Sequence, residues 1–229
     1  MTSPAFDCDA VLFDMDGTIV DSRAIVERTW IGWATEHGIP VETVLAQAHG
    51  RRTLETMQIL APHLATEAEA ARLDAQEAEV DGGETAIPGA LDLLSALPAS
   101  RWAVVTSAGR ALAMRRIEGV GLPVPRVVVG ADDVRVGKPS PEGYLQAAER
   151  LGVPASRCIV IEDTPAGAEA GRSAGARVIG LATTYPTVPF CDVIVRDLRG
   201  IRADRPIPGW AIRLVIETQP LLSNRADPG

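Results

Sequence analysis

The chain has 229 residues, of which 46% are hydrophobic and 23% charged, a composition typical of a folded domain rather than of a disordered segment. Its 30 acidic and 22 basic side chains give a net charge of −8, so we expect no general affinity for nucleic acid or for an anionic membrane surface. No apolar run reaches the roughly 18 residues that a membrane span requires.

The cysteines and the first ten residues indicate the cellular compartment in which the protein is expected. Cys8, Cys158 and Cys191 are odd in number and far apart, which argues against a disulfide framework and for a reducing environment. The first ten residues lack the basic and long apolar regions of a secretory signal. We therefore expect a cytoplasmic protein, and we expect a monomer or a weak homodimer.

The first third of the chain predicts one strand followed by helices. The apolar run 10–13 ends at an Asp- and Gly-containing loop, as a buried strand does. Apolar residues at helical spacing predict a helix over 23–37, with Gly38 as its C-cap. Residues 40–80 are rich in Ala, Glu and Leu and predict several short helices. Gly and Pro punctuate residues 81–89, which we interpret as a linker returning from a helical insert.

The rest of the chain alternates between strand and helix signals. A helix is expected to begin near Pro141 with Ser140 as its N-cap, and another over 166–175. Residues 210–217 are expected to form an edge strand before a disordered tail. Such alternation is typical of βαβ units, in which helices cover both faces of a parallel sheet. Short apolar runs predict the strands, at residues 102–105, 127–129, 158–161, 177–181 and 192–195.

Polar side chains follow the ends of several predicted strands. In an open α/β sheet, ligands bind outside the carboxyl ends of the strands, so side chains far apart in the sequence are expected to meet in one crevice. The residues concerned are Asp14, Asp16, Thr106, Ser107, Lys138, Glu162 and Asp163.

These residue types suit phosphate chemistry. Four carboxylates in one crevice repel one another unless a cation lies among them, and oxygen ligands without His or Cys favour Mg²⁺. The single lysine of the chain, Lys138, and a nearby hydroxyl supply donors for phosphoryl oxygens. A carboxylate facing a phosphate can attack phosphorus and form an aspartyl-phosphate. A second carboxylate two residues later can protonate the leaving group and then deprotonate water.

The order of these motifs resembles that of the haloacid dehalogenase superfamily. The sequence DMDGT at 14–18 resembles its first motif, Thr106 its second, Lys138 in Gly-Lys-Pro its third and the acidic pair 162–163 its fourth. Three further stretches are similar to small sugar-phosphate phosphatases of that superfamily, which act on hexitol phosphates, glycerol 3-phosphate or 2-deoxyglucose 6-phosphate: residues 26–53, 102–107 and 163–167.

The resemblance implies a fold and a domain division. The expected core is a Rossmann-like α/β domain of residues 1–20 and 87–229, with a parallel sheet and helices on both faces. A small all-α cap domain of residues 21–86 is inserted after the first strand.

The resemblance also implies roles for the strand-end residues. Asp14 would be the nucleophile and Asp16 the acid/base, which also lends its backbone carbonyl to Mg²⁺. Thr106 and Lys138 would bind phosphate, with Ser107 adjacent to them. The metal site would be completed by Asp14, Glu162 and Asp163, and Asp163 has a better claim than Glu162.

Each assignment has a simpler alternative. Asp14 and Asp16 can cap a turn, and Thr106 can cap the following helix. Lys138 can be a solvated loop residue, and Glu162 can support the site without touching the metal. In the cap, His49, Arg51 and Arg52 are candidates for gripping the substrate's hydroxyls or phosphate, and the alternative for each is an ordinary surface position.

The expected function is Mg²⁺-dependent hydrolysis of a small sugar or polyol phosphate. The nearest alternative is a phosphomutase resembling β-phosphoglucomutase, which has the same core motifs and differs in its cap. A dehalogenase does not need Asp16, and a phosphonate hydrolase needs a cap lysine that the chain lacks. A catalytically silent module that binds phosphate esters is the alternative from a different class.

Overall fold

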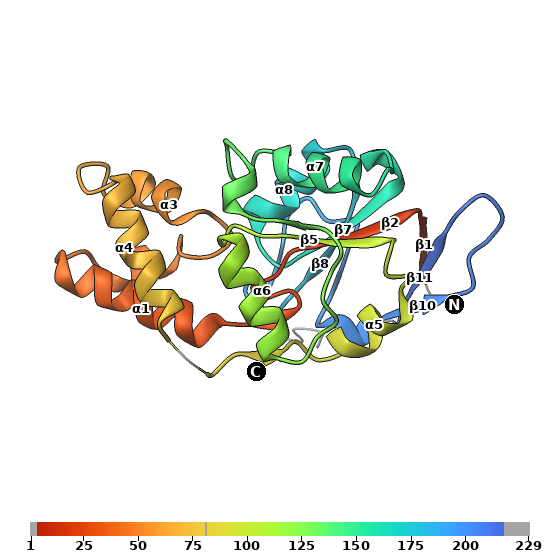
Figure 1. Ribbon diagram of the computed structural model, residues 1–229, viewed down its shortest axis with the longest axis horizontal. Coiled ribbons are helices and arrows are strands. Elements are labelled where there is room, and N and C mark those ends of the chain that lie inside the picture. The colour runs from red at the N-terminus through yellow and green to blue at the C-terminus, as the bar shows by residue number, and fades with distance from the viewer. Residues whose placement is uncertain (1–3, 81, 218–229) are drawn as a thin grey trace, which may run out of the picture.

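The computed structural model describes residues 4–80 and 82–217 (Figure 1). Its main sheet has six parallel strands in the order β6-β5-β2-β7-β8-β9. The predicted α/β class with a parallel sheet is therefore confirmed. The strands are β2 (Ala10–Phe13), β5 (Trp102–Val105), β6 (Val128–Val129), β7 (Cys158–Glu162), β8 (Arg177–Leu181) and β9 (Val193–Val195).

Helices cover both faces of this sheet because its central strands are apolar on both sides. Val11 and Phe13 of β2 pack in one buried cluster, whereas Ala10 and Leu12 pack in another on the opposite face. The first face is covered by α5 (Ala90–Ala96) and α6 (Arg110–Gly119), and the second by α7 (Glu142–Arg150) and α8 (Pro165–Ser173) (Figure 1).

The segment between the first strand of the main sheet and α5 forms a separate helical unit. It lies beyond one end of the sheet, at the left of Figure 1, and has a hydrophobic core of its own that includes Trp30, Trp33 and Met57. Two short antiparallel strands, β3 (Val20–Asp21) and β4 (Thr85–Ala86), connect it to the rest. Its helices are α1 (Arg23–Glu36), α2 (Val41–Leu45), α3 (Thr53–Leu60) and α4 (Glu67–Ala78). The first matches the helix predicted from apolar spacing over 23–37, and the other three match the short helices predicted from the composition of residues 40–80.

A small antiparallel sheet lies at the opposite end of the molecule, at the right of Figure 1, and its order is β1-β11-β10. The predicted edge strand near residue 212 is wrong, because β11 lies between two partners and its alternate residues are buried. The predicted disordered tail lies outside the described residues. The strands are β1 (Ala5–Cys8), β10 (Ile201–Asp204) and β11 (Ile212–Ile216).

Two predicted helix caps differ by one residue from the structure. The C-cap of α1 is His37, and Gly38 follows it with a φ of 65°. The N-cap of α7 is Pro141, while the Ser140 hydroxyl accepts a hydrogen bond from the amide of Glu142. Within the described ranges, three 3₁₀ turns complete the elements: η1 (Ala131–Asp133), η2 (Ala155–Arg157) and η3 (Leu198–Gly200). None of the helices in the described ranges is long and apolar enough to cross a bilayer.

Candidate active site

The candidate site lies at the carboxyl ends of the central strands. Asp14 follows β2, which pairs with β5 on one side and with β7 on the other. Thr106 follows β5, Glu162 ends β7, and Lys138 comes from the loop after β6. The parallel sheet thus brings together side chains up to about 150 residues apart, as expected for this kind of fold.

Lys138 is buried against two carboxylates. Its Nζ contacts a carboxylate oxygen of Asp14 and donates hydrogen bonds to Glu162 Oε1 at 2.7 Å and to the carbonyl of Val105 at 3.2 Å. Burial by itself lowers the pKa of Lys138, but the Asp14 and Glu162 carboxylates outweigh that effect and raise the pKa well above its usual value. The lysine is therefore held as a cation beside Asp14, not solvated at the surface.

Glu162 accepts hydrogen bonds at both of its oxygens. Oε1 accepts from Lys138 and, at 3.3 Å, from the Tyr144 hydroxyl. Oε2 accepts from the amides of Asp163 and Thr164 and from the Thr164 hydroxyl, at 2.7–2.9 Å. A Cβ atom at Gly167 would lie 1.5 Å from Oε1, so only glycine lets α8 pack this closely. These bonds hold Glu162 in one position next to the Lys138 ammonium.

Asp163 has one oxygen bonded and one free. Oδ1 accepts a hydrogen bond from the Thr18 hydroxyl at 2.9 Å, whereas Oδ2 is buried and has no hydrogen-bond partner among the described residues. Burial and the neighbouring Glu162 carboxylate raise the pKa of Asp163 to about 7. A buried carboxylate oxygen without a donor is a costly arrangement unless a cation or proton occupies it.

A divalent cation fits this group of residues. Oxygen atoms of Asp14, Glu162 and Asp163 lie within 4.8 Å of one another. Burial raises the pKa of Asp14 well above its usual range, although the Lys138 ammonium opposes the shift. Three carboxylates around a single ammonium leave an excess of negative charge, which a hard divalent ion would compensate.

Among the described residues, the hydrogen bonds to the Asp16 side chain are made at one of its two carboxylate oxygens. Its Oδ1 accepts hydrogen bonds from the Ser22 hydroxyl at 2.6 Å and from Arg116 at 2.9 Å. Arg116, which is 2% exposed, is not among the site residues predicted from the sequence. Helical spacing contained a signal for it, because Arg116 shares the buried face of α6 with Ala113 and Ile117.

The cavity beside these residues has a volume of about 450 Å³ and lies between the helical unit and the sheet. Thr106 lines this cavity, and its hydroxyl accepts a hydrogen bond from the amide of Ala108, so the capping and binding interpretations are compatible. The Ser107 hydroxyl, on the sheet side of the cavity, donates a hydrogen bond at 3.1 Å to the carbonyl of Gly50, which belongs to the helical unit. Of the predicted residues, the lining includes Asp14, Asp16, His49, Arg51, Thr106 and Ser107.

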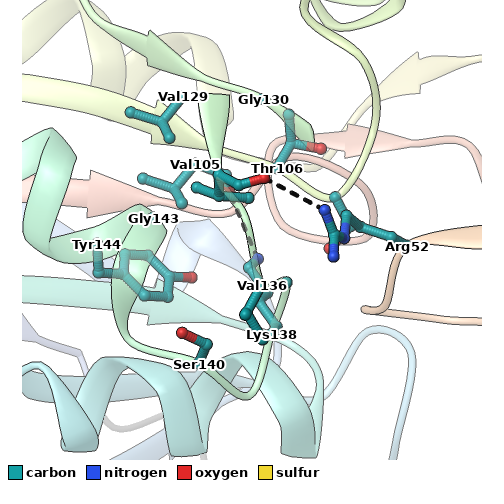
Figure 2. A pocket seen from close by; sticks show the side chains of 13 residues that line it. Arg52, Val105, Thr106, Val129, Gly130, Val136, Lys138, Ser140, Gly143 and Tyr144 are labelled. Carbon is teal, nitrogen blue, oxygen red and sulfur yellow. Dashed lines mark hydrogen bonds between the residues drawn. The ribbon is translucent and has the colours of Figure 1, made fainter. Parts of the chain in front are cut away.

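The three residues predicted in the cap have different surroundings. His49 lines the cavity, and burial lowers its pKa, which favours the neutral imidazole. Arg51 also lines the cavity and donates to the backbone carbonyl of Lys138 at 3.3 Å. Arg52 reaches instead toward the core loop that precedes Lys138 (Figure 2). It donates to the carbonyls of Val134 and Arg135 at 3.3 and 3.0 Å.

Arg52 shares this contact with Glu55, a residue that was not predicted from the sequence. Arg52 Nε donates to Glu55 Oε1 at 3.0 Å, and the same oxygen accepts from the amide of Gly137 at 2.8 Å. A Cβ atom at Gly137 would lie 2.4 Å from Glu55 Oε2. The small cavity of Figure 2, which Arg52, Tyr144 and Lys138 line, has a volume of about 20 Å³, enough for one water molecule.

Comparison with known proteins agrees with this geometry. A family model of haloacid dehalogenase-like hydrolases matches residues 8–175. The chain belongs to this family of hydrolases. Among its relatives, hexitol phosphatase A of Escherichia coli is 40% identical over 90% of this chain and 98% of its own length. Glycerol-1-phosphate phosphohydrolase 2 of Saccharomyces cerevisiae is 38% identical over 85% of this chain and 84% of its own length.

Solved structures show the same haloacid dehalogenase-like arrangement. The crystal structure of a hydrolase from Pseudomonas syringae matches with a TM-score of 0.74 and 26% identity. The match covers 84% of this chain and 94% of that one. It therefore includes both the sheet and the helical unit, because neither alone accounts for that share of the chain.

Proposed function

We propose that the protein is a Mg²⁺-dependent phosphatase that hydrolyses small sugar or polyol phosphates through an aspartyl-phosphate at Asp14. The observation that carries this proposal is the contact of the buried Lys138 ammonium with the Asp14 carboxylate, next to an Asp163 oxygen that lacks a partner in the described chain. The Lys138 ammonium favours the ionised form of Asp14, which is the form that can act as a nucleophile.

Asp14, Asp163 and the backbone carbonyl of Asp16 would hold Mg²⁺, which would offset negative charge on the phosphoryl oxygens. Glu162 is better suited to orient Lys138 than to bind the metal, because both of its oxygens already accept hydrogen bonds. Lys138 and Thr106, with Ser107 adjacent, would donate to the phosphoryl oxygens as charge develops there.

The reaction has two steps. In the first, an Asp14 oxygen attacks phosphorus, the bond from phosphorus to the ester oxygen breaks, and Asp16 gives its proton to the departing alcohol. In the second, Asp16 takes a proton from water, the water oxygen attacks phosphorus, and the bond to Asp14 breaks with release of phosphate. The side chain of Asp16 lines the cavity, where either the alcohol or the water would lie.

We assign residues 21–86 to a cap domain and residues 1–20 and 87–229 to the core. The separate hydrophobic cluster of the helical unit and the paired linkers β3 and β4 support this division. His49 and Arg51 line the cavity from the cap and are candidates for contacts with substrate hydroxyls. Arg52 is better suited to hold the cap against the core loop than to bind the substrate directly.

The substrate class comes from the relatives that cover most of the chain, which are named for hexitol and glycerol phosphates. A cavity of about 450 Å³ accommodates a molecule of that size. A phosphomutase of the same fold would return the phosphoryl group to a second hydroxyl, and a silent module would bind the ester without cleaving it. A cytoplasmic location and a monomeric or weakly dimeric state stay predictions from the sequence.

The test is phosphate release from a panel of phosphomonoesters: hexitol and hexose phosphates, 2-deoxyglucose 6-phosphate, glycerol phosphates, phosphoglycolate and β-glucose 1-phosphate. Each is measured with Mg²⁺, with EDTA and with the Asp14→Asn variant. We expect Mg²⁺-dependent release from sugar or polyol phosphates and none from the variant. Release by Asp14→Asn at the wild-type rate would contradict the nucleophile assignment. Isomerisation of glucose 1-phosphate that requires a bisphosphate activator would identify a mutase.

A further inference from the structure

Arg116 is buried in the core next to the cap and faces three carboxylates. Its side chain is 1% exposed, and its partners come from three segments of the chain. Asp16 belongs to the loop after β2, Glu77 to the last turn of α4 in the cap, and Glu84 to the linker that returns from the cap. An arginine buried among carboxylates keeps its charge and presents several donors in a rigid plane.

The guanidinium of Arg116 bonds to the core on one side and to the cap on the other. One terminal nitrogen donates to Asp16 Oδ1 at 2.9 Å, and the other donates to Glu77 Oε1 at 2.9 Å. The Nε atom lies 3.6 Å from Glu84 Oε1, and no hydrogen bond satisfies it within the described residues. The planar guanidinium cannot tilt toward one partner without changing its contact with the others.

These contacts determine which oxygen of Asp16 is available for chemistry. Oδ1 accepts hydrogen bonds from both Ser22 and Arg116. Among the described residues, no hydrogen bond to Oδ2 is observed, and Asp16 lines the cavity. The carboxylate therefore presents one oxygen to the place where the leaving alcohol and the water would lie.

We propose that Arg116 is a positioning residue for Asp16, and that Glu77 of the cap helps to hold Arg116 in place. The position of Arg116, and through it the orientation of Asp16, is then fully fixed only when the cap brings Glu77 against Arg116. This inference rests on the proposed phosphatase function and adds a mechanism by which the cap affects the acid/base residue, in addition to enclosing the substrate.

The test compares two substrates that differ in their need for an acid. A 4-nitrophenolate leaves without protonation, whereas an alkoxide from glycerol phosphate needs a proton from Asp16. The ratio of kcat/KM for glycerol phosphate to kcat/KM for 4-nitrophenyl phosphate reports the step in which the alcohol leaves. A purely structural defect lowers the active fraction and therefore lowers both values equally, which leaves the ratio unchanged.

We expect Arg116→Gln to lower this ratio by roughly 10-fold or more, since general acid catalysis contributes about 10²- to 10⁴-fold. Asp16→Asn should lower it further, and the double variant should match Asp16→Asn because Arg116 acts through Asp16. Arg116→Lys keeps the charge and should lie between wild type and Arg116→Gln. An unchanged ratio in folded Arg116→Gln protein would overturn the proposal.

Arg115→Gln is the matched control for Arg116→Gln. Arg115 lies next to Arg116 on α6 and donates to the Ala78 carbonyl in the cap, but no contact with Asp16 is observed. Its loss weakens a contact between core and cap without touching the acid/base residue, so the ratio should stay at the wild-type value. A fall equal to that of Arg116→Gln would show that any loss of cap contact has this effect, and would overturn the proposal.

The part played by the cap is tested separately, with variants that leave the core intact. Glu77→Ala should lower the ratio, while Glu79→Ala, at an exposed position that ends the same helix, should not. This pair also serves if Arg116→Gln fails to fold. A wild-type ratio in Glu77→Ala would overturn the assigned role of the cap. If wild-type protein cleaves neither ester, the phosphatase function itself fails, which is a different outcome from a changed or unchanged ratio.

Discussion

Glu162 Oε1 accepts a hydrogen bond from Lys138 Nζ at 2.7 Å and thereby directs the lysine toward Asp14. The remaining acceptor positions of Glu162 are taken by Tyr144, Thr164 and the Asp163 amide. A carboxylate satisfied in this way differs from Asp163, whose Oδ2 has no partner in the described chain. We therefore expect Glu162 to orient the lysine and Asp163 to bind the metal.

Substitution of the two adjacent carboxylates should separate those tasks. We expect Asp163→Asn to raise the Mg²⁺ concentration for half-maximal activity by about 10- to 100-fold, as loss of a group at a metal site commonly does. Glu162→Gln should lower kcat, because a neutral amide holds the Lys138 ammonium less firmly, while Lys138 keeps Asp14 as its partner. Its Mg²⁺ requirement should stay near that of wild type. A Mg²⁺ titration of each variant measures the difference, and equal shifts would make Glu162 a ligand.

The close approach of Gly17 to Asp163 predicts a second effect. Gly17 has a φ of 83°, and a Cβ atom there would lie 2.1 Å from Asp163 Oδ2. Gly17→Ala should therefore displace the metal-binding carboxylate and lower kcat strongly. Gly38→Ala is the matched control, since its φ of 65° is also positive but nothing lies within 4 Å of its Cβ position.

The control should lose about 1–2 kcal/mol of stability from backbone strain alone and keep its activity. Urea unfolding and kcat measured on both variants separate strain from displacement of Asp163. Full activity in Gly17→Ala would contradict the close packing of the two loops.

The contacts of Arg52 predict a change in cap closure rather than in substrate affinity alone. Arg52 and Glu55 together contact the loop of Gly137, whose amide donates to Glu55. Arg52→Gln and Glu55→Gln should therefore change kcat and KM in parallel. If Arg52 binds the substrate directly, only Arg52→Gln will raise KM. Steady-state kinetics on one polyol phosphate distinguish the two, and Gln58→Ala at an exposed position of the same helix is the control.

The stability of the cap should depend on Glu69. Its carboxylate accepts hydrogen bonds from Arg72 at 3.0 Å and from the Trp33 indole at 2.9 Å, and chiefly the Arg72 bond lowers the pKa of Glu69 from 4.5 to about 2. Because the folded-state pKa is the lower one, the stabilisation is complete above about pH 4.5 and is lost as the pH falls toward 2.

Glu69→Gln should therefore lose up to about 1 kcal/mol of unfolding free energy at pH 6, and the difference from wild type should shrink at pH 3.5. Urea unfolding followed by Trp fluorescence measures both values. Glu67→Gln, an exposed residue in the first turn of the same helix, should show a smaller and flatter difference. A difference for Glu69→Gln that grows as the pH falls would contradict the assignment.

Local patterns accounted for most of the elements and for the strand-end residues. Apolar runs ended by polar residues predicted β2, β5 and β7, and the order of the strands explains why Asp14, Lys138 and Asp163 meet. The same patterns misjudged residues 212–216, because a period of two indicates a half-buried strand and not how many partners it has. The positions of two helix caps also shifted by one residue, which is the usual uncertainty of a helix boundary.

Local sequence patterns were enough to predict the α/β class, the family resemblance and the carboxylates and lysine of the candidate site. These properties depend on short motifs, and local periodicity predicts that the motifs lie at the ends of strands. The tertiary structure alone decided that Glu162 is saturated with hydrogen bonds, that Arg52 contacts the core loop, and that Arg116 joins Asp16 to the cap. The bonds of Lys138 to Glu162, of Arg52 to the Val134 carbonyl and of Arg116 to Asp16 join residues 24, 82 and 100 positions apart. Their geometry depends on how whole elements pack, which no local pattern records.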